Sequence, residues 1–289
     1  MKKVIIMIPV FNDWASLTKL LGEINKTIDH FNKIEFECLI LNDASTIEPA
    51  KIFKPQNIKS LRILNIKKNQ GHARCNAFGI RFVLQNEKFD YLLLMDGDGE
   101  DRPEEINNLI NKVLKDPSLS VVAKRVKRSE GPFFQLLYKI HKLITFIFTG
   151  KKINFGNYSL LTKKDAEIIS KQPSLWSSYS GTLKKYISFF NEINSFRGTR
   201  YFGPSKMSLF KLLIHSFSII AVFKFTVFLR STIIIVFLAF FLKTLGLIIF
   251  TIQILIILFC ILVFLTSLRE KKDELDNCYQ NLKDILTIH

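Results

Sequence analysis

A long apolar stretch toward the C-terminal end constrains this chain more than any other feature. Between Ser231 and Leu268 the only charged residue is Lys243. As a helix rising about 1.5 Å per residue, this stretch would be roughly 57 Å long, nearly twice the roughly 30 Å of a membrane's hydrocarbon core. It therefore predicts two membrane-spanning helices that form a hairpin, with a turn near residues 243–246. One long tilted helix is the alternative.

Basic residues flank this stretch on both sides, which by the positive-inside tendency places both ends in the cytoplasm. The stretch lies too late in the chain for a signal peptide, and the first apolar run, "KVIIMIPVF", is too short for one. The flanking residues are Lys206, Lys211, Lys224 and Arg230 before it, and Arg269, Lys271 and Lys272 after it. The expected division is a cytoplasmic domain over 1–204, membrane-interface helices over 205–230, the hairpin over 231–268 and a charged helical tail over 269–289.

Strand-like and helix-like segments alternate over the first 125 residues. Apolar runs predict strands at 3–11, 36–43, 61–69 and 91–98, and amphipathic patterns predict helices at 15–31 and 72–86. Strands that are apolar throughout are typical of a parallel sheet covered by helices on both faces. The sequence thus predicts a doubly wound α/β domain. Two further apolar helices, at 133–150 and 207–225, contain lysines and suit a membrane surface.

The chain is strongly basic, with 41 Lys and Arg against 25 Asp and Glu and a formal net charge of +16. Such an excess suits nucleic acid, anionic lipid or phosphorylated ligands. The apolar stretch favours an anionic membrane surface, and the soluble part lacks the interleaved aromatic and basic residues of nucleic-acid binders. The cysteines have no metal-ligand or redox spacing and are expected to be reduced; they are Cys38, Cys75, Cys260 and Cys278.

Each predicted strand ends in a polar tail. The tails are "PVFND", "LNDAST", "KKNQG" and "MDGDGE". Because ligands bind at the carboxyl ends of the strands in such sheets, the four tails predict one shared site.

The last tail opens a cluster of six carboxylates, "DGDGEDRPEE", at residues 96–105. Asp96 and Asp98, one residue apart at a strand end, can both face a hard cation. Mg²⁺ or Mn²⁺ is commonly bound by one or two carboxylates together with phosphate oxygens. Glu100 would complete the set. The acids after Pro103 are typical of the first turn of a helix.

With these motifs, the chain resembles the family 2 glycosyltransferases, which are inverting enzymes of the GT-A fold. Within them it is similar to the branch of dolichyl-phosphate mannosyltransferase and the bacterial polyprenyl-phosphate glycosyltransferases. The resemblance runs from Val4 to about Leu268 and rests on "IPVFND", "LNDAST", "NQGHARCNAFGI", "MDGDGEDRPEEI", "NYSLLTKK" and "RYFGPSK", followed by two hydrophobic spans. It implies a Rossmann-like, mostly parallel sheet with helices on both faces, a nucleotide-sugar donor, and Mg²⁺ or Mn²⁺ as cofactor.

The resemblance also implies roles for individual residues. The nucleotide-sugar pocket would contain Pro9, Asn12, Asp13, Asp43, Asn69, Gly71, Arg74 and Asp96. The metal would be held by Asp96, Asp98 and Glu100, with Asp98 the more direct ligand. The catalytic set would be Asp98, Glu100, Arg125, Arg200 and Lys206, whose basic members lie near the diphosphate and the acceptor. A guanidinium suits phosphate oxygens because its planar fork can bind two of them.

The chain departs from the family pattern at three places. Glu100 stands where polyprenyl-phosphate members usually have Gln, Asn157 and Ser159 stand where many have Asp and Arg, and Asn42 replaces the first acid of the "VDDGST"-like turn. These changes bear on the sugar and the acceptor more than on the nucleotide.

The acceptor side of the chain lacks acids. From Gly131 to Lys164 there is no Asp or Glu, so a hydroxyl acceptor would need a base from elsewhere, namely Glu100, Asp101, Glu130 or Glu192. A lipid phosphate needs no base because its oxygen is already an anion. This favours a polyprenyl phosphate acceptor.

The sequence thus predicts a membrane-bound glycosyltransferase that moves a sugar from a nucleotide diphosphate to a polyprenyl phosphate, with UDP favoured and GDP the alternative nucleotide. The expected partners are that donor, the lipid-linked acceptor and membrane lipids, with no nucleic acid; a homo-oligomer stays open. Two alternatives remain: transfer to a glycan or glycolipid hydroxyl, and a non-catalytic membrane protein with a degenerate nucleotide-binding domain.

Overall fold

The computed structural model describes residues 1–49, 51–127, 132–203 and 208–289. Within them, eight strands form one sheet in the order β7-β5-β6-β4-β1-β2-β3-β8. The strands are β1 (Lys2–Val10), β2 (Ile34–Asn42), β3 (Ser60–Ile66), β4 (Tyr91–Leu94), β5 (Val121–Lys127), β6 (Phe155–Thr162), β7 (Asn191–Phe196) and β8 (Leu282–Ile288). Strands β3, β2, β1 and β4 run parallel, as predicted, whereas β6 and β8 are antiparallel to their neighbours. The sheet is therefore mixed.

Helices cover both faces of this sheet, which explains why its central strands are apolar throughout. On β1, Val4, Ile6 and Ile8 pack into one core with α1 (Trp14–Ile28) and α3 (Ile106–Lys115). The alternate residues Ile5 and Met7 pack into a second core with the helices of the opposite face. Those helices are α2 (His72–Asn86), α5 (Lys163–Ser170) and α6 (Tyr179–Tyr186). Successive side chains of a strand point to opposite faces, so each face of β1 needs its own apolar set.

The tail after the apolar stretch corrects one prediction. A charged helix was expected there, but only α10 (Lys272–Asp276) and a short 3-10 turn, η3 (Cys278–Asn281), are helical. The chain then forms β8, which pairs antiparallel with the outer edge of β3, from Leu61 opposite Ile288 to Asn65 opposite Asp284. Pairing as a strand also satisfies the exposed backbone groups of the β3 edge, which a separate helix would leave unpaired.

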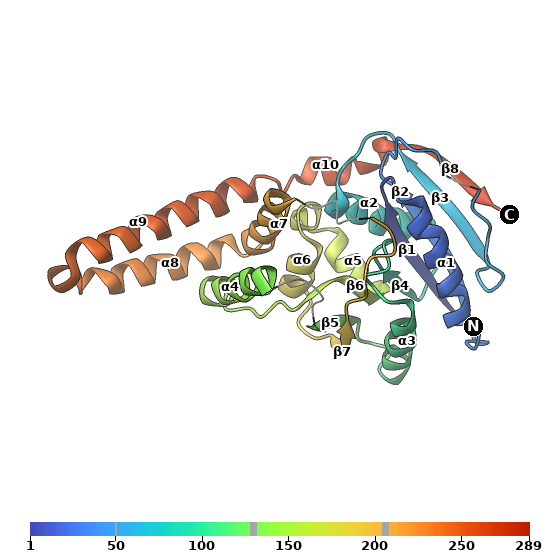
Figure 1. Cartoon of the computed structure of the whole chain (residues 1–289), viewed down its shortest axis with the longest axis horizontal. Helices are drawn as coiled ribbons and strands as arrows, with labels where there is room; N and C mark the ends of the chain where they lie inside the picture. The colour runs from blue at the N-terminus through green and yellow to red at the C-terminus, as the bar shows by residue number, and fades with distance from the viewer. Residues whose placement is uncertain (50, 128–131, 204–207) are drawn as a thin grey trace.

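An arm of two helices extends away from the sheet, and both termini lie at the opposite end of the molecule (Figure 1). The arm consists of α8 (Lys224–Ala239) and α9 (Leu242–Ser267), which run side by side. Gln253 donates a hydrogen bond to the carbonyl of Ile235 across them at 3.0 Å. The predicted turn is displaced slightly, because the helices separate at residues 240–241 and Gly246 interrupts the start of α9 with non-helical backbone angles.

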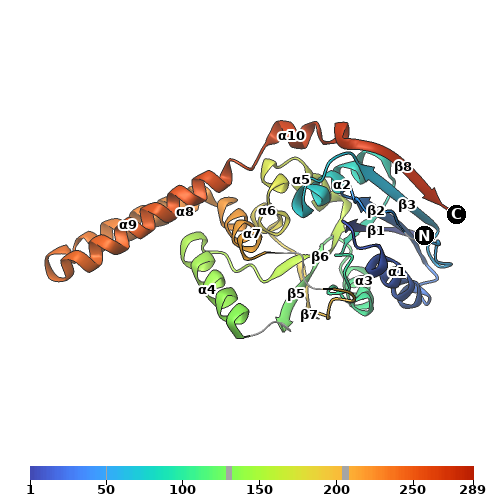
Figure 2. The same ribbon diagram turned by 45° about the horizontal axis from the view of Figure 1, so that its top comes forward.

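One helical segment of the described residues, Gly246–Asp276, is long and apolar enough to cross a membrane. A second span would require α7 (Leu209–Ala221) and α8 to count as one helix bent by 86°. The two crossings thus stay a prediction. The helices expected at 133–150 and 207–225 form, as α4 (Pro132–Thr149) and α7, and Figure 2 shows both where the arm meets the body of the protein. Their place at a membrane surface stays a prediction. Both expose large apolar side chains, such as Leu143 on α4 and Phe210 on α7.

Candidate functional site

The loop after β4 carries the carboxylate cluster to the carboxyl edge of the sheet. Its shape is fixed by hydrogen bonds within the loop: the backbone amide of Asp96 donates to Oδ2 of Asp101 at 2.9 Å, and that of Glu100 donates to Oδ1 of Asp98 at 3.0 Å. Gly99 has a φ of +88°, and a Cβ there would lie 2.5 Å from the ring of Tyr201. The loop therefore needs glycine at this position for two reasons, its backbone angle and the close approach of Tyr201.

Two arginines that follow β7 neutralise part of this cluster. Arg200 donates to Oδ2 of Asp98 at 2.8 Å and also pairs with Asp13, while Arg197 pairs with Glu100. The backbone of the same segment is bound as well, since the amide of Tyr201 donates to the carbonyl of Asp98 at 2.9 Å. Arg200 thus joins the ends of the neighbouring strands β1 and β4.

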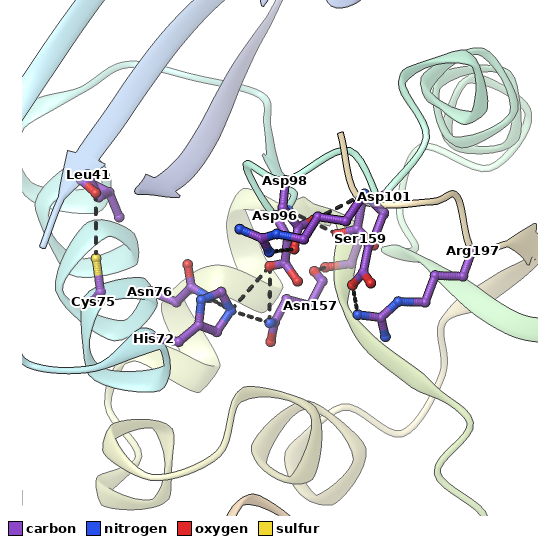
Figure 3. A network of polar contacts seen from close by, with 12 residues as sticks. Leu41, His72, Cys75, Asn76, Asp96, Asp98, Asp101, Asn157, Ser159 and Arg197 are labelled. Atoms are coloured by element: carbon purple, nitrogen blue, oxygen red, sulfur yellow. Dashed lines mark hydrogen bonds and ion pairs between the residues drawn. The ribbon is translucent and has the colours of Figure 1, made fainter. Parts of the chain in front are cut away.

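Asp96 lies in a different set of contacts, which Figure 3 shows. Its Oδ1 is 3.2 Å from Nε2 of His72, the first residue of α2, and 3.5 Å from Nδ2 of Asn157 on β6. Asn157 Nδ2 is 2.5 Å from the same His72 nitrogen, and Asn76 Nδ2, one turn along α2, is 3.2 Å from it. The sequence analysis did not single out His72, Asn76 or Arg197. The available signal for His72 was a basic residue directly after the strand-end "NQG".

Arg125, expected near the diphosphate, does lie close to the carboxylates. It comes from β5, and a Cβ at Gly156 of β6 would collide with its guanidinium group. Its positive charge helps to lower the pKa of Asp96. The absence of a side chain at Gly156 therefore gives Arg125 its place beside the cluster.

The electrostatics of the cluster separate its members. Burial alone would raise the pKa of Asp96, but the charge and hydrogen bond of His72, with Arg125 and Arg197, hold it well below its usual range. Burial and the neighbouring charge of Asp96 raise the pKa of Asp98 to about 6 and that of Asp101 to about 8. Burial opposes protonation of His72, yet Asp96 outweighs it and raises the pKa of the ring. Asp96 is therefore the most firmly ionised of the three acids.

The residues expected in the nucleotide pocket surround the ends of β1 and β2. Pro9 is in β1 opposite Leu41 of β2. Asn12, in a left-handed conformation with φ 52°, accepts hydrogen bonds from the backbone amides of Thr46 at 2.8 Å and Ile47 at 3.0 Å. This contact holds the two strand-end loops against each other, with Asp13 following directly and bound by Arg200.

Asp43 has a structural role in the same region. Its side chain is only 4% exposed and accepts hydrogen bonds from the backbone amides of Gln70 at 2.7 Å and Gly71 at 2.9 Å. It therefore ties the end of β2 to the loop that leads into α2. Gly71, the residue just before this helix, has a φ of +82°. Asn69, two residues earlier, is exposed.

Arg74 is the expected pocket residue that the structure directs elsewhere. Its guanidinium pairs with Glu274 of α10 at 3.4 Å and lies 5.4 Å from the centre of the Trp176 ring. Arg74 thus joins α2 to the C-terminal segment. Lys206 and Glu130 lie outside the described residues.

Besides Glu100, the residues that depart from the family pattern take up local contacts. Asn42 donates to Oδ1 of Asn65 at 2.8 Å and accepts from the amide of Ser45 at 2.9 Å, so it links β2, β3 and the turn. Ser159 is buried, with its hydroxyl 2.5 Å from that of Tyr179. Of these three residues, Asn157 is the one that reaches the carboxylate cluster.

The arrangement limits how a metal could be held. Throughout the described part of the chain, no three His, Cys, Asp or Glu side chains gather as a metal-binding group. The expected set of three carboxylates is not assembled, because Glu100 faces Arg197. Asp96 and Asp98 remain as hard oxygen donors on one loop. They fit a cation that completes its shell with phosphate oxygens.

Comparisons with curated proteins give distant relatives. The chain is 26% identical over 218 residues to the undecaprenyl-phosphate 4-deoxy-4-formamido-L-arabinose transferase of Salmonella choleraesuis, covering 73% of this chain and 64% of that protein. It is 26% identical over 112 residues to an uncharacterised protein of Methanocaldococcus jannaschii, covering 38% of this chain and 46% of that protein. The chain thus matches less than two thirds of the length of either relative.

Solved structures share the fold at low sequence identity. Glucosyl-3-phosphoglycerate synthase from Mycobacterium tuberculosis, crystallised with Mn²⁺, UDP-glucose and phosphoglyceric acid, matches with a TM-score of 0.53 and 11% identity over 78% of this chain and 80% of that chain. A mannosyltransferase from Pyrobaculum calidifontis, in complex with GDP-mannose and Mn²⁺, matches with a TM-score of 0.50 and 13% identity over 93% of this chain and 87% of that chain. These likenesses show the GT-A fold.

The family model described as glycosyl transferase family 2 matches residues 5–179, more than half of the chain. This range runs from β1 to the start of α6. It includes the strand-end loops of the site but not Arg197 and Arg200. The chain belongs to glycosyl transferase family 2.

Proposed function

We propose that the protein is a glycosyltransferase that moves a sugar from a nucleotide diphosphate to a polyprenyl phosphate at the cytoplasmic leaflet. The observation that carries this proposal is the meeting of Asp98, Asp13 and Arg200 at the carboxyl edge of the sheet. There, two strand-end carboxylates share a guanidinium that can also bind phosphate oxygens. The Salmonella relative, named for transfer involving undecaprenyl phosphate, supports a lipid phosphate acceptor.

The donor would lie over the strand ends of β1, β2 and β4. Asp96 and Asp98 would hold Mg²⁺ or Mn²⁺ together with the diphosphate, and the cation would supply positive charge to the departing diphosphate oxygens. The described structural neighbours bind Mn²⁺ with UDP-glucose or GDP-mannose. We favour UDP, with Asn12 and Asp13 nearest the nucleotide and Asp43 holding the loop beneath it.

The proposed acceptor depends on whether any carboxylate is placed to act as a general base. Glu100 is paired with Arg197, Asp101 is 6% exposed and accepts a hydrogen bond from the amide of Asp96, and Glu192 pairs with Lys124 at 3.5 Å. Among the described residues, a hydroxyl acceptor would need one of these three carboxylates to face it; Glu130 lies outside them. A phosphate acceptor would instead need cations, and Arg125 and Arg200 supply them beside the cluster.

The pairing of β8 supports the membrane topology that we propose. The arm leaves the body after α7 and returns through α10 to β8, which pairs with β3 of the same sheet. Lys224 at the start of α8 also pairs with Glu270 after α9 at 2.9 Å. Both ends of the arm are therefore held together, which supports two crossings for an arm inserted in a membrane. The basic flanks favour the cytoplasm as the side on which both ends lie.

One assay tests this function against its alternatives. The full chain, in detergent or nanodiscs, should be given a panel of UDP- and GDP-sugars with Mn²⁺, with and without polyprenyl phosphate. Sugar transfer that requires polyprenyl phosphate supports the proposal. Transfer to a glycan or glycolipid without consumption of polyprenyl phosphate would establish the hydroxyl alternative, and the lack of any nucleotide binding would establish the non-catalytic one.

A further inference from the structure

His72 is held from three sides at the point where the donor would lie. The backbone just before it is held by Asp43, whose Oδ2 accepts a hydrogen bond from the amide of Gly71 at 2.9 Å. Its Nε2 faces Asp96 Oδ1 at 3.2 Å, with amide groups of Asn76 and Asn157 at 3.2 and 2.5 Å. Side chains from α2, β6 and the loop after β4 thus surround Nε2 of the ring (Figure 3).

The hydrogen-bond roles follow from the chemistry of the imidazole. Asp96 is an ionised acceptor, so Nε2 of His72 must carry a hydrogen to bind it. The same nitrogen cannot then accept from the amide of Asn76 or of Asn157, and Asn157 donates instead to Oδ1 of Asp96 at 3.5 Å. His72 and Asn157 thus both donate to Oδ1 of Asp96.

This convergence leaves the second oxygen of Asp96 for a ligand. A carboxylate that is free to rotate must lose that freedom when it binds a cation or a sugar hydroxyl, whereas one held at Oδ1 is already oriented. Groups that orient a ligand-binding side chain in this way typically change affinity or activity about 10- to 100-fold when they are removed. The His72 side chain is 41% exposed, so it lies at the rim of the site and not inside the core.

We propose that His72, supported by Asn157, is a positioning residue that holds Oδ1 of Asp96 and thereby orients this carboxylate toward the cation and diphosphate of the donor. This rests on the proposed function. It assigns to His72 a role in donor binding and none in the bond-forming step.

The test compares His72→Leu with His72→Gln, because the amide of Gln can donate from nearly the same place as Nε2 and Leu cannot. Binding of UDP and GDP to the full chain should be measured by calorimetry, first with Mn²⁺ and then with EDTA. We expect His72→Leu to weaken Mn²⁺-dependent binding about 10- to 100-fold, and His72→Gln to recover most of that loss. Binding in EDTA should be equal in all three proteins, since the contacts of the base and ribose are not changed.

Steady-state kinetics add a second readout. In His72→Leu the KM for the donor should rise while the KM for polyprenyl phosphate stays constant, a split that general destabilisation would not produce. His30→Leu is the matched control. His30 is exposed and precedes β2, so it lies at the amino ends of the strands, away from the site. Thermal unfolding of each variant would confirm that it folds.

The outcomes separate the two proposals. If wild type binds a nucleotide with Mn²⁺ and His72→Leu binds it equally well, the role of His72 is overturned while the proposed function stands. A His72→Gln variant as weak as His72→Leu would also overturn it, because the hydrogen bond would then not be what matters. If wild type binds neither nucleotide under any condition, both proposals are overturned.

Discussion

The guanidinium of Arg200 lies 2.8 Å from Oδ2 of Asp98, across 102 residues of sequence. A residue expected beside the acceptor thus contacts directly a residue expected to bind the metal. An Mn²⁺ ion bound by Asp98 would have to share or replace this contact. The arginine would then be available to the phosphate groups of the donor or acceptor.

Arg200→Ala should cripple sugar transfer. It removes a charged contact to Asp98 and Asp13 and leaves two neighbouring carboxylates without their shared cation. Losing a contact to a charged group typically costs about 1.5–3 kcal/mol, or roughly 10- to 150-fold in rate. Arg200→Lys should recover only part of the rate, because an ammonium cannot bind both carboxylates with one planar fork. Unchanged initial rates in Arg200→Ala would contradict the assignment.

Asp98→Asn and Glu100→Gln should differ in metal-dependent nucleotide binding. Asp98→Asn is expected to abolish the dependence on Mn²⁺, whereas Asp96→Asn should be milder. Glu100→Gln should leave it within about threefold, since this carboxylate is paired with Arg197 and does not join Asp96 and Asp98 in a metal-binding group. Calorimetric titration of UDP at several Mn²⁺ concentrations measures this. Equal losses in Asp98→Asn and Glu100→Gln would mean that Glu100 leaves Arg197 to bind the metal.

Asp101 should make the folded protein less stable as pH rises from about 4 to 8. Burial raises its pKa to about 8 in the folded state, against about 3.9 in the unfolded chain. The folded state therefore keeps a proton that the unfolded state loses, and the stability from this group is fully present below about pH 4 and lost through pH 8.

Asp101→Asn isolates this effect, because its amide oxygen can still accept from the amide of Asp96. Its melting temperature should fall less than that of wild type between pH 5 and pH 8. A difference of about 1 kcal/mol would appear as a shift of roughly 2–4 °C. Asp98 and His72 act in the same direction, and they remain in both proteins. Parallel pH profiles of the two proteins would refute the raised pKa of Asp101.

Tags at the N-terminus and after His289 should be accessible only from the cytoplasmic side, since β1 and β8 belong to one sheet. A cysteine placed at Phe240, which is 81% exposed between α8 and α9, should be labelled only from the other side of the membrane. Cys260→Ser would remove the partly exposed native thiol. Access to a C-terminal tag from the side opposite the N-terminal tag would mean one crossing and would be incompatible with β8 in the sheet.

Neither Asp101 nor Glu192 should prove to be an indispensable general base. Glu192→Gln and Asp101→Asn should retain transfer to polyprenyl phosphate, with the same rate dependence on pH as wild type, because a phosphate oxygen needs no deprotonation. A collapse in rate that steepens as pH falls in either variant would instead indicate a hydroxyl acceptor.

Local patterns in the sequence determined the elements around the site. The run that became β1 was predictable because a strand buried on both faces is apolar throughout. The run that became α2 was predictable because a helix buried on one face has apolar residues at helical spacing. The position of Asp96 and Asp98 directly after a strand followed for the same reason. The length and apolar composition of the stretch after Ser231 likewise predicted its helices.

Only the tertiary structure decided which groups meet. Nothing local distinguishes Leu282–Ile288 from a short helix, and it became β8 because the edge of β3 offered it backbone hydrogen bonds. The partners of the carboxylates, His72, Arg197 and Arg200, come from other elements, and Arg74 turns away to Glu274. Secondary structure is set largely by neighbours in sequence, but ion pairs and hydrogen bonds between distant residues exist only once the sheet has brought its strand ends together.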